Sequence, residues 1–374
     1  MGEQHKIRVL QVLGSLDMGG AESRIMDVYR SIDRKLVSFD FLILKSGKQY
    51  YEEEVRELGG VIFHEKMPGI NKLFHHINSV RKIIREGRYD VVHAHTSYHC
   101  GLIMYAAWRE RVPVRIAHSR TTGSKRNGIF KKLMFVVGKI LISLYATKRF
   151  AISYDAGRFL FGSDDFEVLP NAIDVSKYQA TSKERIQELK QEFSIPDGAV
   201  VVGQVGRFHP MKNHKFTIKW FSQYVQSHCN SVLILVGDGN LKAEIISLAK
   251  EFHIDNRVRF VGIRSDIEEV LHVFDILFFP SIYEGLGGVI LESQAAGVPA
   301  VISDSIPQDV DLRIGLVYRC NLNSSNEIWS DMVDRAIQSI TPNNKIIAEA
   351  FEKKKYSLSF ENNRLLDEYS KGIR

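Results

Sequence analysis

The stretch Glu284-Gly-Leu-Gly-Gly-Val-Ile-Leu-Glu292 joins an apolar strand, predicted over Asp275–Pro280, to an Ala-rich helix predicted over Glu292–Gly297. The first N–H groups of a helix have no partner within it, so a glycine-rich turn at this point can direct backbone N–H groups at an anion. A carboxylate at Glu292 can accept two hydrogen bonds from a vicinal diol such as a ribose. The stretch therefore predicts a site for a phosphorylated nucleotide, whose candidate N–H donors are Gly287, Gly288 and Val289.

The simpler interpretation of this stretch is a helix start whose acidic residues favour the helix dipole. That interpretation accounts for Glu284 but not for Glu292, which lies within the expected helix.

Around this stretch, apolar segments of strand length alternate with helical patterns along the whole chain, which is typical of parallel sheets covered by helices on both faces. The alternation stops at the turn-rich segment Val168–Asp174 and starts again at Ala199. We therefore expect an α/β protein of two doubly wound, Rossmann-like domains, over residues 1–175 and 176–355. The strands expected in the first are Ile7–Leu13, Phe39–Leu44, Val61–His64, Val91–His95, Val114–Ala117 and Arg149–Ser153; those in the second are Val200–Val205, Val232–Val236, Val258–Phe260 and Ile276–Phe279.

The bulk composition agrees with a soluble globular protein. The chain has 374 residues, of which 44% are hydrophobic and 25% charged, and this length favours two cores over one. No apolar run is long enough to span a bilayer, and the first residues lead into a strand, so we expect a cytoplasmic protein. Cys100, Cys229 and Cys320 lie far apart and show no CxxC spacing, which argues against a disulfide framework or a zinc site.

A basic pair follows the expected strand Val200–Val205. Arg207 offers a planar fork of donors and Lys212 a point charge, and at the carboxyl edge of a parallel sheet the two can neutralise a diphosphate. The alternative is a solvated basic loop without a ligand.

The formal net charge of +6 is unevenly distributed, because no acidic residue occurs between Arg111 and Tyr154. The Lys125–Arg149 region combines cations with apolar residues at helical spacing. It is either a helix packed on the sheet or a surface that contacts anionic lipid. Nucleic acid is a less suitable partner, because the aromatic residues there do not form a stacking platform.

Three histidines, His93, His95 and His118, lie at the carboxyl ends of expected strands, where we expect them to face one cleft. A lone histidine is more often structural than catalytic, and His-x-His without a further ligand is weak support for a metal. Gly19 and Gly20 precede a helix and can let the backbone approach a phosphate, although the spacing from Gly14 to Gly20 does not match a dinucleotide fingerprint. We expect no metal and no cofactor.

Several of these blocks occur together in the order of a known family. The two acids with seven residues between them, the run Ser293–Ser303, the block Val205–His214 and the loop Gly19–Glu22 resemble the retaining family 4 glycosyltransferases. That resemblance spans nearly the whole chain. It implies the GT-B fold, in which two Rossmann-like domains face each other across a cleft, and a C-terminal helix over residues 356–374 that crosses back to the N-terminal domain.

The resemblance also implies roles for individual residues. Arg207 and Lys212 would hold the nucleotide diphosphate and stabilise it as it leaves, and Glu284 would bind hydroxyls of the donor sugar. The ribose would be bound by Glu292 and the base by the loop that begins at Gly262 and Ile263. A histidine at the position of His118 would approach the donor sugar, so the implied catalytic residues are Arg207, Lys212, Glu284 and His118, with further donor contacts at Gly19, Gly20, Gly287, Gly288 and Val289.

We therefore predict a retaining hexosyltransferase that uses a nucleotide-diphosphate sugar, most simply a UDP-sugar, and a lipid-linked saccharide acceptor at the inner face of the cell membrane. The block Arg115–Ser119 and the run Pro280–Leu286 resemble members that build capsular or extracellular polysaccharide. Two alternatives are a sugar-nucleotide epimerase of the same architecture and a non-catalytic nucleotide-sugar-binding partner of another transferase. An epimerase should carry additional acid/base carboxylates, which the sequence does not identify, and intact acidic and basic residues argue against a silent partner.

Overall fold

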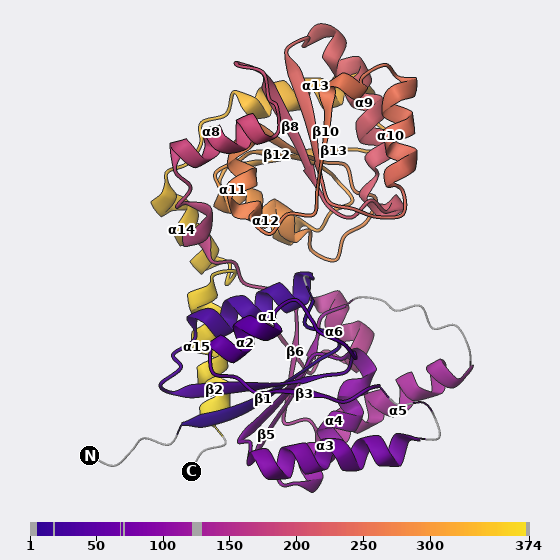
Figure 1. Ribbon diagram of the computed structural model, residues 1–374, viewed down its shortest axis with the longest axis vertical. Coiled ribbons are helices and arrows are strands. Elements are labelled where there is room, and N and C mark those ends of the chain that lie inside the picture. The colour runs from indigo at the N-terminus through magenta and orange to yellow at the C-terminus, as the bar shows by residue number, and fades with distance from the viewer. Residues whose placement is uncertain (1–5, 18, 68, 70–71, 122–128, 372–374) are drawn as a thin grey trace. The chain divides into compact units, whose positions relative to one another are not determined.

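The structure is a computed structural model that describes residues 6–17, 19–67, 69, 72–121 and 129–371. The chain divides into two compact units (Figure 1). Unit 1 consists of Met1–Ala172 together with Leu358–Arg374, and unit 2 consists of Ile173–Ser357. The sequence predicts these divisions after residues 175 and 355.

Unit 1 is built on a seven-stranded parallel sheet in the order β3-β2-β1-β4-β5-β6-β7. Strand β1 buries every residue except Arg8, as expected for a strand with helices on both faces. The strand order reverses direction between β1 and β4. Open α/β sheets bind ligands at such a switch point, beyond the carboxyl ends of the strands. The strands are β1 Ile7–Leu13, β2 Val37–Ile43, β3 Ile62–His64, β4 Val91–Ala94, β5 Val114–Ser119, β6 Lys148–Ala151 and β7 Glu167–Val168.

Two helical layers cover the sheet of unit 1, and alternate strand residues face each layer. Val9 of β1 packs in one core with residues of α1 and α15, whereas Leu10 packs in another with α3 and α4. The helices are α1 Gly20–Ser31, α2 Glu52–Glu57, α3 Leu73–Gly87, η2 Ser97–His99, α4 Cys100–Arg109, α5 Ile129–Tyr145, α6 Tyr154–Phe161 and α15 Leu358–Ser370.

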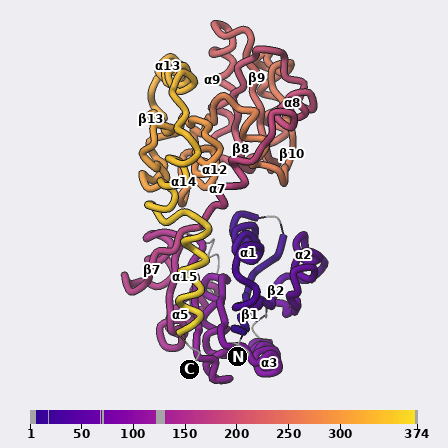
Figure 2. Tube along the Cα trace, turned by 90° about the vertical axis from the view of Figure 1, so that its left-hand side faces the viewer, coloured from indigo at the N-terminus to yellow at the C-terminus, as the bar shows by residue number. Residues whose placement is uncertain are grey.

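Helix α15, the last of the chain, belongs to unit 1, where it packs against α1 and runs along the unit in Figure 2. Arg364 donates two hydrogen bonds of 2.6 Å to the carboxylate of Glu167 on β7, which Lys148 also contacts at 2.6 Å. Burial alone would raise the pKa of Glu167, but these hydrogen bonds from Arg364 and Lys148 lower it to about 2. The ion cluster and the apolar residues Leu365 and Tyr369 therefore fix α15 on the sheet.

Unit 2 repeats the architecture with a six-stranded parallel sheet in the order β10-β9-β8-β11-β12-β13. Its switch point lies between β8 and β11. The strands are β8 Val200–Val205, β9 Ser231–Val236, β10 Val258–Gly262, β11 Ile276–Phe279, β12 Ala300–Ser303 and β13 Val317–Cys320. The helices are α7 Val175–Tyr178, α8 Lys183–Glu192, η3 Pro210–Lys212, α9 His214–Ser227, α10 Lys242–Glu251, η4 Asp255–Arg257, α11 Ile267–Val270, η5 Leu271–Val273, α12 Gly288–Ala295, η6 Gln308–Val310, α13 Asn326–Ile337 and α14 Asn344–Lys353.

The prediction of two parallel-sheet α/β domains is thus confirmed. Some boundaries were wrong for a local reason. The strand expected over Arg149–Ser153 ends at Ala151, because Ser153 caps helix α6 by accepting a hydrogen bond from the N–H of Ala156. None of the helices in the described part of the chain has the length and apolar character required to cross a membrane.

Candidate functional site

At the carboxyl edge of the sheet in unit 2, the loop after β8 packs directly on the loop after β9. The Phe208 N–H donates to the carbonyl of Asp238 at 3.0 Å. A Cβ on Gly237 would lie 2.3 Å from the Gly206 carbonyl oxygen, and one on Gly239 would lie 2.5 Å from that of Phe208. The two backbones can approach this closely only because both residues are glycine. The sequence analysis missed this loop, although its signal, Gly-x-Gly directly after a buried strand, is visible in the sequence.

Lys212 and Glu284, predicted as site residues from separate motifs, lie together. The Lys212 Nζ is 2.7 Å from the Glu284 Oε1 and 4.6 Å from the centre of the Phe279 ring. The two side chains retain 24% and 13% of their exposure, so the ion pair is neither fully buried nor fully solvated. Glu284 Oε1 has no aligned hydrogen bond, and the contact is therefore one of charge rather than of hydrogen-bond geometry.

Backbone contacts fix this pair in place. The buried Gln204 side chain donates to the carbonyl of Lys212 at 2.8 Å, and the Ile282 N–H donates to the carbonyl of Met211 at 2.8 Å. The Asn213 side chain donates to the carbonyl of Pro280 at 3.1 Å. These hydrogen bonds join the loop after β8 to the loop after β11, and they explain why residues far apart in sequence form one charged pair.

His214 adds to the charge arrangement at this edge. Burial first, and then the neighbouring Lys212 ammonium, lower the pKa of His214 to about 4. The ring is neutral at ordinary pH, so Lys212 rather than His214 supplies positive charge beside Glu284. Arg207 follows β8 directly; its side chain is exposed and forms no ion pair with any described residue.

The glycine-rich turn ends in helix α12, which begins at Gly288 and not, as the sequence predicts, near Glu292. Gly287 has a φ of 87°, a left-handed conformation that glycine adopts without strain, and it accepts the N–H of Ile290 at 2.9 Å. Gly288 and Val289 form the first turn of the helix, with Glu292 one turn further on and partly exposed. The predicted amide donors therefore do lie at a helix N-terminus.

Gly262 and Ile263 lie at the carboxyl end of β10. The Gly262 carbonyl accepts the N–H of Gly237 at 2.7 Å, which joins this loop to the loop after β9. Ile263 is 69% exposed. The following Arg264 forks onto Asp266 with hydrogen bonds of 2.8 and 2.6 Å, so this loop has a fixed shape.

In unit 1, Gly19 and Gly20 lie at the start of α1, after β1. Gly19 is the N-cap and offers no side-chain cap, and a Cβ there would lie 2.5 Å from the Glu22 carboxylate. Gly20 has open space where a Cβ would be. The Glu22 carboxylate therefore lies against the start of the helix, and open space remains beside Gly20.

The histidines of unit 1 are placed differently from the expectation. His93 and His118 are buried on the sheet face covered by α15, and only His95 is partly exposed. The structure brings the three rings together, with the His93 Nε2 at 3.2 Å from the His118 Nδ1. In this structure no ring atom of His118 is open to solvent, so its contact with a donor sugar stays a prediction.

These three histidines are the one group among the described residues whose geometry could hold a metal ion, since their nearest nitrogens lie within 4.8 Å of one another. Most of those nitrogens are already engaged. His95 uses both, with Arg120 at 2.9 Å and Gln11 at 2.9 Å, and His93 uses both, with Tyr369 at 2.9 Å and His118. An arginine cation beside the rings also opposes a metal cation.

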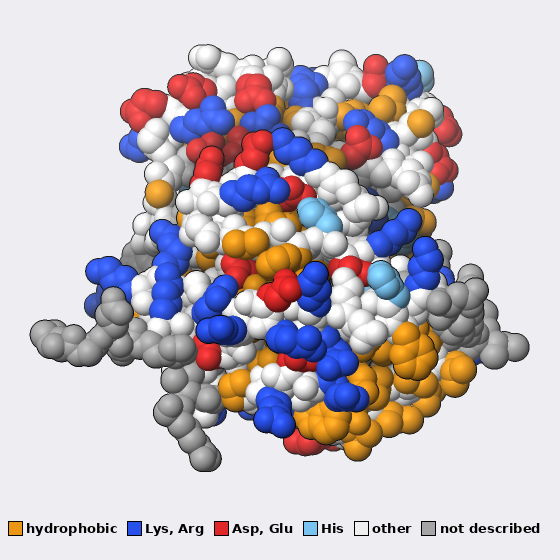
Figure 3. All heavy atoms as spheres, turned by 60° about the horizontal axis from the view of Figure 1, so that its bottom comes forward, with side chains coloured by type: hydrophobic (Ala, Val, Ile, Leu, Met, Phe, Trp, Pro, Cys, Tyr) orange, Lys and Arg blue, Asp and Glu red, His pale blue; other side chains and the backbone are white. Residues whose placement is uncertain are grey.

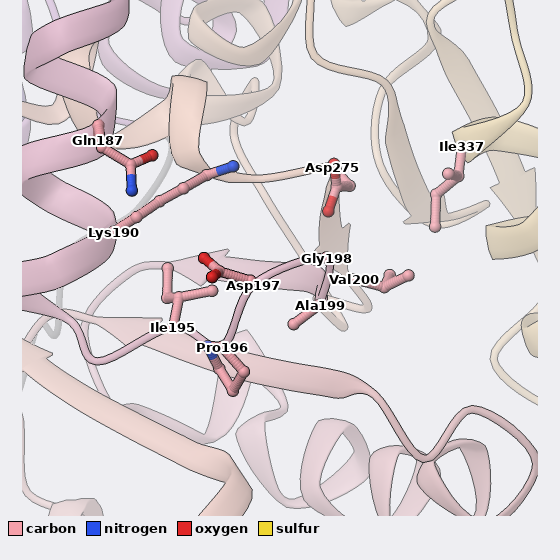
Figure 4. Close-up of a pocket in the computed structure, with 10 residues that line it drawn as sticks. All are labelled: Gln187, Lys190, Ile195, Pro196, Asp197, Gly198, Ala199, Val200, Asp275 and Ile337. Atoms are coloured by element: carbon pink, nitrogen blue, oxygen red, sulfur yellow. The ribbon is translucent and has the colours of Figure 1, made fainter.

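A cavity at the opposite edge of unit 2 is separate from this site. It is lined by the segment Ile195–Val200 before β8, by Asp275 before β11 and by Lys190 from α8 (Figure 4). Asp275 has a raised pKa because of burial, and its carboxylate accepts the N–H of Val201 at 2.7 Å. The cavity lies at the amino ends of the strands, away from Lys212 and Glu284.

Together these observations define a class of protein. Each unit is a doubly wound α/β domain with a glycine-rich helix start at the carboxyl edge of its sheet, and unit 2 adds cations and a carboxylate at that edge. Such sites bind phosphorylated, sugar-bearing ligands.

Comparisons with known proteins identify the family. Residues 18–177 match the family described as Glycosyltransferase Family 4, and residues 185–310 match Glycosyl transferases group 1. The chain is 36% identical over 370 residues to the putative glycosyltransferase EpsF of Bacillus subtilis (strain 168), covering 97% of this chain and 96% of that protein. It therefore belongs to this glycosyltransferase family and is an enzyme of that class.

Two further relatives are more distant. The capsular polysaccharide biosynthesis glycosyltransferase CapH of Staphylococcus aureus is 25% identical, over 82% of this chain and 83% of that protein. The UDP-Gal:alpha-D-GlcNAc-diphosphoundecaprenol alpha-1,3-galactosyltransferase of Escherichia coli is 26% identical, over 60% of each. In fold, the chain resembles Anabaena HepE, solved in complex with UDP-glucose, with a TM-score of 0.78 at 20% identity over 98% of this chain and 100% of that one.

Proposed function

We propose that this glycosyltransferase moves a hexose from a UDP-sugar to a lipid-linked saccharide, with retention of the anomeric configuration, in the synthesis of capsular or extracellular polysaccharide. The observation that carries the proposal is the Lys212–Glu284 pair at the carboxyl edge of unit 2, in the same unit as the helix start at Gly288. Cation and main-chain amides suit a diphosphate, while a carboxylate suits sugar hydroxyls.

In the proposed reaction, unit 2 binds the donor. Lys212, Arg207 and the N–H groups at the start of α12 neutralise the charge that develops on the diphosphate as the bond to the anomeric carbon breaks. Glu284 orients the hexose, Glu292 binds the ribose, and Gly262 and Ile263 lie against the base.

The acceptor hydroxyl forms the new bond on the face that the diphosphate leaves, and its proton passes to the departing phosphate oxygen. No side chain acts as a covalent nucleophile in this scheme, and neither a metal nor a cofactor takes part. The lysine and arginine cations perform the charge stabilisation that a divalent ion performs in other sugar-nucleotide sites.

The names of the relatives support the choice of substrates. CapH is named for capsular polysaccharide biosynthesis, and the Escherichia coli relative for a UDP-galactose donor and a diphosphoundecaprenol-linked acceptor. HepE was solved with UDP-glucose.

A lipid-linked acceptor requires access to a membrane, and helix α5 of unit 1 offers a surface for it. Four apolar side chains at helical spacing along its outer face are 53–65% exposed: Leu133, Val136, Ile140 and Leu144. Lys131 and Lys132 are exposed beside them, and Figure 3 shows hydrophobic side chains gathered on this part of unit 1 with lysine and arginine nearby. We propose that α5 binds the inner face of the cell membrane, with cations on anionic head groups. The part of the Lys125–Arg149 region before residue 129 lies outside the described residues.

The test combines ligand binding with transfer. A ligand that binds only the folded state raises the free energy of unfolding, by about 2.7 kcal/mol at a hundredfold excess over Kd. The melting temperature rises with it. We expect UDP and one UDP-sugar to stabilise the wild-type protein and the control Lys345→Gln, whose lysine is an exposed surface residue of α14. Arg207→Gln, Lys212→Gln and Glu292→Gln should each weaken UDP binding at least tenfold.

Incubation with the bound UDP-sugar and a polyprenyl-diphosphate saccharide should then give an α-linked product from an α-linked donor, as read by NMR. Turnover of the UDP-sugar without acceptor would indicate an epimerase, and UDP binding without any turnover would indicate a silent partner. Equal melting shifts in all variants would refute the site.

A further inference from the structure

Arg120 of unit 1 is a cation whose direct hydrogen-bond partners are neutral side chains. It follows β5 at the carboxyl edge of the sheet, where its Nε donates to the His95 Nδ1 at 2.9 Å and its Nη1 donates to the Asn171 Oδ1 at 2.5 Å. No carboxylate of the described residues forms an ion pair with it, and Glu22 and Glu361 act on it only at longer range. Burial lowers the pKa of Arg120, because a buried cation is costly unless an anion lies beside it.

The orientation of this guanidinium is fixed by a hydrogen-bond chain whose direction follows from the chemistry of arginine. An arginine only donates, so the His95 Nδ1 must accept and its hydrogen must lie on Nε2. That N–H donates to the Gln11 Oε1 at 2.9 Å. The Gln11 Nε2 then donates to the phenol oxygen of Tyr369 on α15 at 3.3 Å.

The second half of the chain continues from the phenol into the core of unit 1. Since the Tyr369 oxygen accepts from Gln11, its O–H donates to the His93 Nδ1 at 2.9 Å. His93 in turn donates from Nε2 to the His118 Nδ1 at 3.2 Å. His118 therefore carries its hydrogen on Nε2, which has no aligned acceptor among the described residues.

The three histidines of this hydrogen-bond network are neutral at ordinary pH. Burial first, and then the charge of Arg120, hold the pKa values of His93 and His118 well below the ordinary value. His95 has the same shift from burial, its histidine neighbours and Arg120. Arg120 is consequently the cation of the network, held in place through two bridging side chains by the C-terminal helix.

We propose that Arg120 binds a phosphate group of the acceptor substrate at the carboxyl edge of unit 1, and that Gln11 and Tyr369 are positioning residues for it. Its two described partners take two of the five N–H donors of a guanidinium, which leaves three for phosphate oxygens.

This inference rests on the proposed function, which already assigns the donor diphosphate to the cations of unit 2. An acceptor linked through a diphosphate brings a second anionic group, and unit 1 supplies the separate cation that it requires. Arg120 then has a direct ionic partner whenever the acceptor is bound.

The first experiment measures the affinity of farnesyl diphosphate, a short soluble probe for a prenyl diphosphate, by calorimetry at saturating UDP. We expect Arg120→Gln to weaken this affinity at least tenfold and to leave the Kd of UDP unchanged. The control Arg158→Gln removes a surface arginine of the same unit, paired with Asp164, and should change neither. Farnesol, which lacks the phosphates, should bind wild type and Arg120→Gln equally weakly.

Unchanged binding of farnesyl diphosphate to Arg120→Gln would overturn the proposal. A parallel loss of UDP affinity would overturn it as well, since Arg120 would then serve the donor. If UDP fails to bind the wild-type protein, the proposed function fails, whereas a selective loss of farnesyl diphosphate in Arg120→Gln would still support an anion site on unit 1.

The second experiment tests the positioning residues with Tyr369→Phe, which keeps the ring and removes the hydroxyl. Nitrogen-15 NMR of the histidines should show hydrogen on Nε2 of His93, His95 and His118 in the wild type. In Tyr369→Phe the signals of His93 and His118 should change, and the Kd of farnesyl diphosphate should rise about threefold. Unchanged tautomers and unchanged affinity in a folded variant would show that Tyr369 does not position Arg120.

Discussion

At the scale of single residues, the two glycines at the start of α12 carry opposite structural demands. Gly287 has a φ of 87°, and a Cβ there would lie 3.0 Å from the Ile290 side chain. Gly288 is the first helical residue, and a Cβ there would meet no atom within 4 Å. Only Gly287 is required by the backbone conformation. Gly288 leaves open space in which a ligand can approach the backbone.

We predict that Gly288→Ala separates stability from ligand binding. Alanine favours a helix over glycine by about 1 kcal/mol, so the melting temperature should stay the same or rise. If the diphosphate docks on these amides, the new methyl group meets it, and the Kd of UDP measured by calorimetry should rise at least tenfold. Gly287→Ala is the matched comparison and should lower the melting temperature through backbone strain. Unchanged UDP affinity in Gly288→Ala would place the phosphates elsewhere.

The sequence predicts the residue types of this site better than their arrangement. The spacing of Glu284 and Glu292 and the position of Lys212 after a strand are visible in the primary structure. Their juxtaposition depends on hydrogen bonds such as Ile282 N–H to Met211 carbonyl, which only the packed loops create. Arg120 stayed unnoticed as a site residue because its hydrogen bonds to His95 and Asn171 form only in the folded unit.

At the scale of elements, α5 buries one face and exposes another that is also apolar. Phe135, Gly138 and Ile142 point into unit 1, with the Cα of Gly138 so close to Gly101 of α4 that a Cβ on Gly101 would lie 2.8 Å from it. The exposed stripe from Leu133 to Leu144 is therefore not needed to hold the helix. An apolar stripe of this kind marks an interaction surface.

We predict that the double variant Val136→Ser with Ile140→Ser loses binding to anionic lipid vesicles in sedimentation, because each removed side chain withdraws about 1–2 kcal/mol of apolar transfer. The melting temperature should change little, since both side chains are more than half exposed. Ile340→Ser with Ile346→Ser, at exposed positions of unit 2, is the matched control and should bind vesicles like the wild type. Equal vesicle binding by all three proteins would contradict the membrane proposal.

The same scale shows where pattern reading fails. Strands with continuous apolar runs, such as β1 and β9, were predicted within a residue, because burial on both faces leaves a strong signal. The start of α12 was misplaced, because glycine at Gly288 is a poor helix former and the helix there depends on its turn and its packing. Helices α6 and α14 have clear caps, Ser153 and Asn343, that the apolar pattern alone does not reveal.

At the scale of the whole molecule, buried histidines are concentrated in one unit. Among the described residues, burial is the main cause of a lowered pKa at five histidines of unit 1 and at two of unit 2. The unit 1 group is His76, His93, His95, His99 and His118, and the unit 2 group is His214 and His272. The two units should therefore respond differently to acid.

We predict that unit 1 loses more stability than unit 2 between pH 7.5 and 5.5. A histidine with a depressed folded pKa takes up a proton on unfolding once the pH falls below about 6.5, so its contribution is complete above that pH and falls by about 1.4 kcal/mol per unit below it. Carboxylates with lowered pKa values, such as Glu167, act only below about pH 4.5. Hydrogen-exchange mass spectrometry at each pH resolves the two units.

His99, with a pKa lowered to about 3, gives the sharpest variant. His99→Gln should reduce the pH slope of unit 1, and His75→Gln, at an exposed position on α3, should leave it unchanged. Equal slopes in the two units, or an unaltered slope in His99→Gln, would show that buried neutral histidines do not set the acid sensitivity of this enzyme.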